Sequence, residues 1–485
     1  MTSADPFNHA PATTSWMWER RALEDPRALA ELEQLAAGDP TAAASSRLQP
    51  TAAQLQRTRA RLGSPELASA VWRLALARRK GRTKFADADR LWLDLVAVEQ
   101  ATAPAVALWK ASRLVSAAGG SYGSRPTVIL DLCCGVGSDA LALAQMGANL
   151  VALDRDAGMI QRVTWNARVR GVDKYLRGVV GNAAHPPCRL IGGWLHVDPD
   201  RRPGQDHRRA RQRRAVTIAG YQPGPDVLER LIERTQGGAV KFSPADDWPD
   251  FAARLEARGI AVEVEVVSWM RECKEATLWY GAAAEVAGAR RRATALPSGR
   301  TWTDRDARRV ADGMLWPSSP SRESCPRGAF LFDPDPCLER AGLLDEFARA
   351  WGLTRLEPAL GCDWLMIHGD EAETMERDRL ASLNGWGGLY RVESEGPADL
   401  KFWRARLREM GVGRVVVKTQ RWPEPAEAVQ RRLTWDATAR LEGWTLFLQG
   451  GMTRRARAIL AWGPMDESDH VAHPDFNSAR GGTGT

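Results

Sequence analysis

From residue 127 to residue 280, short apolar runs of strand length alternate with segments of helical character. This alternation is typical of a parallel sheet whose strands are joined by crossover helices. The predicted parallel strands cover residues 127–132, 150–153, 176–180, 193–197 and 239–242. Two further apolar runs, 261–267 and 276–280, leave no room for a helix between them, so they predict an antiparallel pair at the sheet edge.

A glycine-rich loop follows the first predicted strand, in the sequence Asp131-Leu-Cys-Cys-Gly-Val-Gly-Ser-Asp139. Gly135 and Gly137 let the backbone turn sharply and approach a ligand closely before the next helix. With Ala140 the loop also fits the looser dinucleotide pattern G-x-G-x-x-G/A. The loop alone therefore leaves three readings open: S-adenosylmethionine, a dinucleotide such as NAD, or a glycine turn without a ligand.

Polar side chains near the ends of the first three strands help to decide which ligand, if any, the glycine-rich loop binds. Asp131 stands four residues before the first glycine, where its carboxylate or the neighbouring backbone can meet the positively charged methionine end of S-adenosylmethionine. Asp154 ends the second strand and can accept hydrogen bonds from both ribose hydroxyls, a role that dehydrogenases share. Asn182 follows the third strand, where it either contacts the adenine amine or is an ordinary turn residue. Five parallel strands ending in a hairpin favour S-adenosylmethionine, and the predicted cofactor-binding residues are Asp131, Cys133, Gly135, Gly137, Asp139, Asp154 and Asn182.

The fourth predicted strand ends in the sequence His196-Val-Asp-Pro-Asp-Arg-Arg202. Ligands bind at the carboxyl ends of parallel strands, so Asp198 is predicted to lie beside the transferable methyl group and to orient a nucleophile or accept its proton. The alternative is that Asp198 and Pro199 only begin a turn. Seven arginines between residues 201 and 214 predict phosphate contacts, although such a block is also typical of a solvated surface.

Length and composition bound the remaining possibilities. A chain of 485 residues predicts about three domains. Of its 67 basic residues, 59 are arginine, a bias that suits nucleic-acid binding but also follows from codon usage.

The seven cysteines form no C-x-x-C pair and have no histidine at zinc-ligand spacing, so no disulfide framework and no metal site are predicted. Without a signal-peptide pattern or an apolar run of about 18 residues, we expect a cytoplasmic protein with no membrane span.

The predicted organisation has five parts. Helical spacing between residues 16 and 115 predicts a helical N-terminal region at 1–118, followed by the α/β domain at 119–285. Residues 286–328 show little periodicity and are predicted to be a linker or a basic loop. A second, smaller α/β domain is predicted at 329–465, with helices at 338–351, 400–410 and 424–433 and strands at 364–368, 414–418 and 444–448. The tail at 466–485 is predicted to be disordered.

Several short motifs occur together in an order and spacing that resemble one known family. They are Lys84-Phe85, Glu99-Gln-Ala-Thr102, the glycine-rich loop, Asp198-Pro-Asp-Arg-Arg202, Lys241-Phe-Ser-Pro244, Glu272-Cys-Lys-Glu275 with Leu278-Trp-Tyr-Gly281, Asp333-Pro-Asp-Pro-Cys-Leu338 and Gly411-Val-Gly-Arg-Val-Val-Val-Lys418. The chain resembles bacterial class I methyltransferases that carry a C-terminal THUMP-like domain. The resemblance implies a Rossmann-like catalytic domain, a ferredoxin-like (THUMP-like) α/β domain, S-adenosylmethionine as cofactor and a structured RNA as substrate.

The resemblance also implies roles for individual residues. Asp198 and Pro199 are expected in the active-site loop as the catalytic pair, and the residues expected to bind substrate are Glu99, Thr102, Arg201 and Arg202. The chain departs from the family pattern at Cys133 and Ser138, where the family has Gly, and at Asp200, where it has Ala. The stretch Lys418-Thr-Gln-Arg421 replaces the family's Lys-Lys-Arg-Gly. Two alternatives to an RNA methyltransferase therefore stay open: a non-catalytic RNA-binding protein with a degenerate methyltransferase fold, and an NAD-dependent oxidoreductase.

Overall fold

The computed structural model describes residues 15–37, 50–119, 128–188, 193–201, 217–285, 288–306, 325–356, 363–367, 383–436, 438–439, 443–450 and 456–464. The predicted tail, Arg202 and the rest of the arginine block lie outside these residues. The chain divides into two compact units, which are Met1–Val267 with Lys274–Arg290, and Ser268–Cys273 with Arg291–Thr485. Within the described residues, no helix combines the length and the apolar character needed to cross a membrane.

Unit 1 begins with a series of short helices, as predicted for residues 16–115. They are α1 (Ser15–Glu24), α2 (Pro26–Ala36), α3 (Ala52–Leu62), α4 (Pro65–Gly81), α5 (Leu95–Gln100) and α6 (Pro104–Ala117). Side chains of Asp25, Thr51, Ser64 and Asp94 accept hydrogen bonds from the first backbone N–H groups of α2, α3, α4 and α5, which explains where these helices begin. Helices α1, α2, α3 and α5 all pack against α4.

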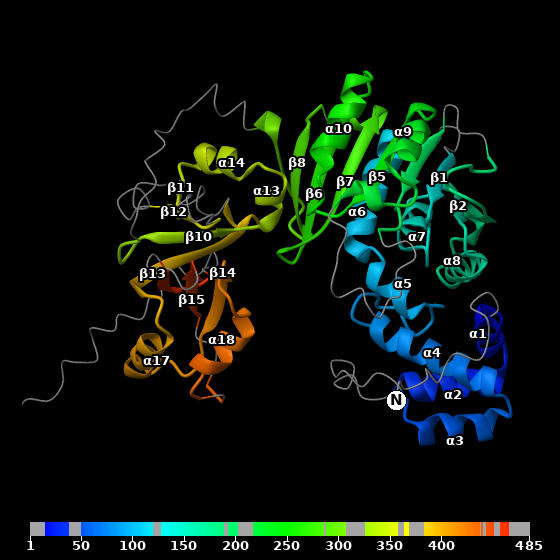
Figure 1. Ribbon diagram of the computed structural model, residues 1–485, viewed down its shortest axis with the longest axis horizontal. Coiled ribbons are helices and arrows are strands. Elements are labelled where there is room, and N and C mark those ends of the chain that lie inside the picture. Colours follow the sequence, from blue (N-terminus) through cyan, green and yellow to red (C-terminus); the bar gives the residue numbers. More distant parts are fainter. Residues whose placement is uncertain are drawn as a thin grey trace, which may run out of the picture. The chain divides into compact units, whose positions relative to one another are not determined.

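In unit 1 the strands of the sheet have the order β3-β2-β1-β4-β5-β7-β6, of which β2, β1, β5, β7 and β6 are labelled in Figure 1. Its strands are β1 (Val128–Leu132), β2 (Asn149–Asp154), β3 (Leu176–Val180), β4 (Trp194–Val197), β5 (Gly237–Phe242), β6 (Val262–Trp269) and β7 (Glu272–Gly281). The pairs β3–β2, β2–β1, β1–β4 and β4–β5 are parallel, whereas β7 is antiparallel to β5. This confirms the five predicted parallel strands, and β7 and β6 are neighbours in the sheet. The chain changes direction across the sheet between β1 and β4, which creates the switch point where open α/β sheets bind ligands.

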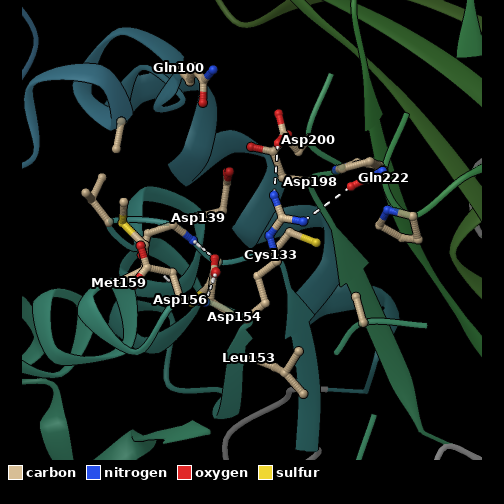
Figure 2. A pocket seen from close by; sticks show the side chains of 18 of the residues that line it. Gln100, Cys133, Asp139, Leu153, Asp154, Asp156, Met159, Asp198, Asp200 and Gln222 are labelled. Carbon is tan, nitrogen blue, oxygen red and sulfur yellow. Dashed lines mark hydrogen bonds and ion pairs between the residues drawn. The ribbon is translucent and has the colours of Figure 1, made fainter. Parts of the chain in front are cut away.

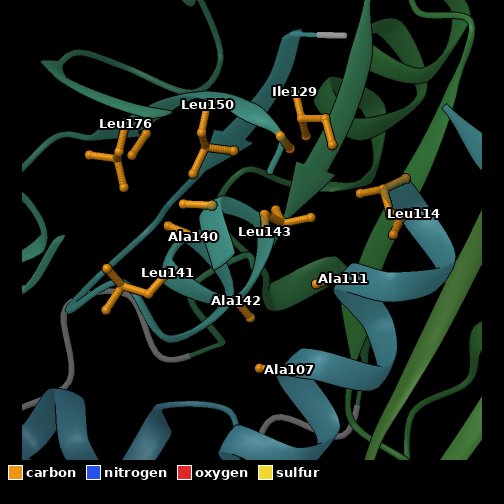
Figure 3. Close-up of a cluster of buried hydrophobic side chains, with 14 of the residues drawn as sticks. Ala107, Ala111, Leu114, Ile129, Ala140, Leu141, Ala142, Leu143, Leu150 and Leu176 are labelled. Atoms are coloured by element: carbon orange, nitrogen blue, oxygen red, sulfur yellow. The ribbon is translucent and has the colours of Figure 1, made fainter. Parts of the chain in front are cut away.

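Helices that follow the strands cover this sheet. They are α7 (Ser138–Gln145), α8 (Ala157–Val169), α9 (Pro225–Glu233), α10 (Trp248–Ala257) and α11 (Ala282–Glu285), with 3-10 turns at Asp173–Tyr175 and Ile218–Gly220. Figure 3 shows the core in which Ala107 and Ala111 of α6 face Ala140 and Leu143 of α7, beside Ile129 of β1. The small alanine side chains let α6 approach α7 closely, so α6 lies against the helix that begins at the glycine-rich loop.

A buried carboxylate also ties α6 to the hairpin of β6 and β7. Glu265 of β6 is fully buried and accepts hydrogen bonds from Trp109 Nε1 at 2.9 Å, Trp279 Nε1 at 2.8 Å and the Arg113 guanidinium at 2.9 Å. A buried charge is tolerated only where such partners satisfy it. Glu265 therefore links the β6–β7 hairpin to α6, which lies more than 150 positions earlier in the sequence.

Unit 2 contains a sheet with the order β11-β12-β10-β13-β16-β15-β14. Its strands are β10 (Phe330–Pro334), β11 (Thr354–Arg355), β12 (Leu365–Ile367), β13 (Gly387–Pro397), β14 (Val416–Gln420), β15 (Trp444–Gln449) and β16 (Arg457–Trp462), and its helices are α13 (Pro336–Arg340), α14 (Leu344–Trp351), α17 (Leu400–Glu409) and α18 (Ala426–Leu433). Neighbouring strands are antiparallel except for the parallel pair β14 and β15. Its assignment as a THUMP-like domain stays a prediction.

Unit 2 differs from the sequence predictions in several places. Four of its strands, β10, β11, β13 and β16, were not predicted. Within the segment 286–328, expected to be irregular, β8 (Arg291–Leu296) and β9 (Arg300–Thr303) form an antiparallel hairpin. The last four residues of β8 are all buried, so the strand lacks the alternation of buried and exposed residues that reveals a half-buried strand. The helix predicted at 338–351 is interrupted between α13 and α14, where Gly342 adopts a φ of 66° that ends the first helix.

We expect Glu265→Ala to lower the free energy of unfolding by about 3–5 kcal/mol, because Arg113 and two indole N–H groups lose a buried acceptor. This corresponds to a fall in melting temperature of about 10 °C, measured by circular dichroism. The matched control is Glu24→Ala, which removes an exposed i,i+4 partner of Arg20 and should cost less than about 0.5 kcal/mol. Equal melting temperatures for the two variants would contradict the structural role of Glu265.

Candidate functional site

A cavity of about 620 Å³ opens at the carboxyl ends of β1, β2 and β4, at the switch point of the sheet (Figure 2). The predicted site residues that line it are Thr102, Cys133, Gly135, Asp139, Asp154, Asn182, Asp198, Pro199 and Arg201. Asp131, Gly137 and Glu99 do not line it. Figure 2 also shows Gln100, Asp156, Met159 and Gln222 at the cavity, which the sequence analysis did not select.

The glycine-rich loop needs left-handed backbone at three positions. The φ angles are 61° at Cys133, 53° at Gly135 and 92° at Gly137. A Cβ at Gly137 would lie 2.3 Å from Val163 Cγ2 of α8, so only glycine fits there, whereas a Cβ at Gly135 would meet nothing within 4 Å. Gly137 therefore allows α7 to pack on α8, and Gly135 leaves open space at the cavity. Cys133 bears the cost of a left-handed conformation for a residue with a side chain, about 1–2 kcal/mol.

Asp131 lies behind the loop, in a buried pair with His196. The two residues are register partners on β1 and β4, and His196 Nδ1 lies 2.6 Å from Asp131 Oδ1. Burial raises the pKa of Asp131, and His196 opposes this rise. Among the described residues, Asp131 Oδ2 and His196 Nε2 have no hydrogen-bond partner. His196 is not among the site residues predicted from the sequence. Its place two residues before Asp198, on the strand next to that of Asp131, is the signal that could have identified it.

Asp154 holds the end of β2 against the glycine-rich loop. Its Oδ2 accepts a hydrogen bond from the backbone N–H of Gly135 at 3.0 Å, and its Oδ1 accepts one from Asp156 at 2.9 Å. Burial raises the pKa of this carboxyl group, and the two backbone donors oppose the rise. Asn182 lines the same cavity, and its Oδ1 accepts a hydrogen bond from the Ala184 N–H at 2.9 Å in a turn. Both residues are thus fixed by backbone contacts while they face the cavity.

The carboxylate of Asp198 is joined to buried groups behind the cavity. Lys241, at the end of β5, donates hydrogen bonds to Asp198 Oδ2 at 2.7 Å and to Thr102 Oγ1 at 2.8 Å. The Thr102 hydroxyl in turn donates to Asp139 Oδ2 at 2.7 Å. Thr102 was predicted to bind substrate, but it donates its hydroxyl proton to Asp139, so this proton is not directed at a ligand.

The same network continues to α6 and β7. The ammonium of Lys110 lies 3.0 Å from Asp139 Oδ1 and 2.8 Å from Glu275 Oε1. Burial disfavours the charged form of Lys110, but the two carboxylates outweigh it and raise the pKa of Lys110. Burial likewise opposes ionisation of Asp139, yet Lys110 and further cations hold the pKa of Asp139 well below its usual range. Lys110 is not among the residues predicted from the sequence, and Lys241 was part of a motif to which no role was assigned.

Weaker contacts surround the mouth of the cavity. Arg155 donates a hydrogen bond to Gln222 Oε1 at 3.3 Å and lies 3.7 Å from Asp200 Oδ2, contacts that Figure 2 draws as dashed lines. Glu99 lies outside the cavity, where its half-exposed carboxylate pairs with Lys80. Its neighbour Gln100 lines the cavity instead.

Lys84 supports the segment that carries Gln100 and Thr102. Its ammonium donates to the backbone carbonyls of Val98 at 2.8 Å and Ala101 at 2.6 Å, at the C-terminal end of α5. Burial, together with nearby lysines led by Lys241, lowers the pKa of Lys84 to about 8. Lys84 thus connects the resemblance motif Lys84-Phe85 to the wall of the cavity.

The cavity has a strongly acidic lining. Its charged lining residues are the aspartates 139, 154, 156, 198 and 200 and the arginines 155 and 201. Carboxylates that face a partly enclosed space attract a cationic ligand. The arrangement therefore suits a ligand with a net positive charge better than one that carries a pyrophosphate.

No protein-family model matches the chain. Two curated relatives, from Mycobacterium tuberculosis strains CDC 1551 and H37Rv, are each 29% identical over 269 residues and are named uncharacterized S-adenosylmethionine-dependent methyltransferases. The match covers 54% of this chain and 63% of each relative, so the chain spans less than two thirds of their length. A crystal structure from Porphyromonas gingivalis W83, provisionally named a methyltransferase, has a TM-score of 0.56 and 16% identity over 93% of this chain and 98% of that one. This likeness shows a class I methyltransferase-like α/β fold.

Substitutions at the two glycines of the loop should have unequal effects on stability. We expect Gly137→Ala to lower the free energy of unfolding by about 2–4 kcal/mol, because the new Cβ overlaps Val163 and the residue has a φ of 92°. Gly135→Ala should cost only about 1 kcal/mol, since its Cβ meets open space. Urea unfolding measures both. Adding Val163→Ala should recover part of the Gly137→Ala loss, and failure of that recovery would contradict the steric explanation.

Proposed function

We propose that this protein is an S-adenosylmethionine-dependent methyltransferase that methylates a base in structured RNA. The observation that carries the proposal is an acid-lined cavity at the switch point of a methyltransferase-like sheet. S-adenosylmethionine has a sulfonium and an ammonium against one carboxylate, so its net charge is positive. The names of the mycobacterial relatives support the same cofactor.

The groups at the start of α7 argue against the oxidoreductase alternative. A dinucleotide pyrophosphate binds at the N-terminus of the helix that follows the glycine-rich loop. Here the first turn of α7 contains Asp139, and Ser138 Oγ donates to the Thr102 carbonyl at 2.7 Å. A pyrophosphate bound at this position would lie next to the carboxylate of Asp139, so its negative charge would be repelled.

The described residues fit S-adenosylmethionine in the following way. Asp154 would bind the ribose hydroxyls and Asn182 the adenine amine, because both face the cavity from the ends of β2 and β3. The backbone from Cys133 to Gly137, with Asp131 behind it, would hold the methionine part, and Asp139 would add negative charge near its cationic groups. When bound, the cofactor supplies an electrophilic methyl group on sulfur.

Asp198 and Pro199 would orient the acceptor atom for a displacement in which alignment is the main requirement. Asp198 lies at the cavity with its position fixed by Lys241 and by its backbone N–H, which donates to the Leu132 carbonyl at 3.2 Å. Methylation of a pyrimidine carbon would need a thiolate nucleophile. Among the described residues, the cysteines that line the cavity are Cys133 and Cys134, and burial raises the pKa of both thiols well above the usual value. We therefore expect a nitrogen or oxygen acceptor.

RNA as the acceptor rests on charge and on resemblance. Arg201 lies at the cavity beside the catalytic loop, and arginine predominates among the basic residues of the chain. The motifs Asp333-Pro-Asp-Pro and Gly411 to Lys418 extend the family resemblance into unit 2, for which we propose a THUMP-like, RNA-binding role. Arg202, in the undescribed segment, would add a further phosphate contact.

Cofactor choice is tested by isothermal titration with S-adenosylhomocysteine and, separately, with NAD. We expect S-adenosylhomocysteine to bind and NAD not to bind. Asp154→Ala should weaken S-adenosylhomocysteine binding by about 10–100-fold, because it removes the proposed acceptor for two ribose hydroxyls. Glu99→Ala, which alters a carboxylate outside the cavity, serves as the control and should change affinity by less than about threefold. Binding of NAD in place of S-adenosylhomocysteine would favour the oxidoreductase.

Catalysis is tested by transfer of a tritiated methyl group from S-adenosylmethionine to total bacterial RNA. Asp198→Asn should lower kcat by about 100-fold or more while S-adenosylhomocysteine affinity stays within about threefold. Asn is preferred to Ala because it leaves an oxygen for the buried ammonium of Lys241. If the native protein binds S-adenosylhomocysteine but labels no RNA, the non-catalytic alternative or another acceptor takes the place of this proposal.

A further inference from the structure

Lys241 combines burial, charge and position in a way that the proposed function does not yet use. It is one of only 8 lysines beside 59 arginines, and its side chain is 5% exposed. It stands in β5, one residue after Val240, the register partner of Val197, so it lies beside Asp198, which directly follows β4. Its ammonium reaches Asp198 Oδ2 at 2.7 Å and Thr102 Oγ1 at 2.8 Å, but Lys241 does not line the cavity.

We propose that Lys241 is a positioning residue, which fixes one carboxylate oxygen of Asp198 so that the other is presented to the acceptor. This inference rests on the proposed methyltransferase function and deepens it. Among the described residues, Asp198 Oδ1 has no hydrogen-bond partner, whereas Oδ2 is held by Lys241. The exposed oxygen is therefore suited to an acceptor atom that carries a hydrogen, such as the N–H of a base.

The direction of each hydrogen bond behind Asp198 supports this role. The Thr102 hydroxyl donates its only proton to Asp139, so its oxygen is an acceptor toward Lys241. Asp139 is in turn paired with Lys110. Positive and negative groups thus alternate from the core to the cavity, and Lys241 completes the series beside Asp198. Because Thr102 and Asp198 both bind the ammonium of Lys241, its contact with Asp198 is supported from a second side.

The choice of lysine at this position also has a physical reason. An ammonium directs its donors tetrahedrally from one atom and can reach two oxygens on different elements within a small volume. A guanidinium is larger and planar and favours both oxygens of one carboxylate. Arginine at 241 would therefore compete for Asp198 Oδ1, the oxygen that the acceptor needs. This explains why the chain, although rich in arginine, has lysine here.

The test is a double-mutant cycle on methyl transfer to total bacterial RNA, with Lys241→Met and Asp198→Asn. Lys241→Met removes the ammonium but keeps the length of the side chain. We expect kcat to fall by about 30–100-fold, with the KM for S-adenosylmethionine and the affinity for S-adenosylhomocysteine within about threefold. In the Asp198→Asn background, the same substitution should lower kcat by less than about threefold further, because Lys241 acts through Asp198.

Two further variants separate positioning from a general loss of structure. Lys241→Arg should restore part of the kcat lost in Lys241→Met, because it returns a cation to Asp198. Lys174→Met, which removes an exposed lysine from the same unit, should leave kcat unchanged. Additive losses in the cycle, or a parallel fall of S-adenosylhomocysteine affinity and melting temperature in Lys241→Met, would overturn the positioning role. A native protein that binds no S-adenosylhomocysteine would instead refute the proposed function, which is a separate and distinguishable result.

Discussion

The ammonium of Lys110, enclosed by the carboxylates of Asp139 and Glu275, is the interaction on which the architecture of the site depends. It connects α6 and α7 with β7, and Lys110 and Glu275 are 165 positions apart in the sequence. Removing one member of such a group leaves an unpaired buried charge, which costs about 3–5 kcal/mol. The start of α7 is therefore held in place, and with it the glycine-rich loop that ends at Gly137. Alanines on the facing surfaces of α6 and α7 let the helices come close enough for these contacts.

The strands and the location of the cavity could be predicted from the sequence because the signals are local. Apolar runs of strand length give β1 to β7, and the rule that ligands bind at strand carboxyl ends brings Asp154, Asn182 and Asp198 to one place. The pairing of Lys110 with Glu275 and of Lys241 with Thr102 joins residues that are 165 and 139 positions apart. A lysine in an apolar helix or strand gives no sign of such a partner, so these groups required the structure.

Predictions for unit 2 were less complete for a related reason. β13 contains three glycines and several charged residues, and β8 is buried along its last four residues, so neither shows the alternation typical of a half-buried strand. β13 pairs with β10 and β16, which lie far from it in the chain, whereas β8 pairs with β9 after a short turn. By contrast, α17 and α18 were predicted within a few residues of their ends, since amphipathic helices repeat their pattern over several turns.

The contacts of Arg155 with Gln222 and Asp200 differ in kind from those on the opposite wall of the cavity. The guanidinium is largely exposed, and solvent-exposed pairs of this sort contribute at most about 1 kcal/mol. The wall formed by Thr102 and Asp139 belongs to a network that costs several times more to break. A ligand that needs more room at this cavity would therefore displace the side chain of Arg155 at a lower cost in free energy than that of Asp139.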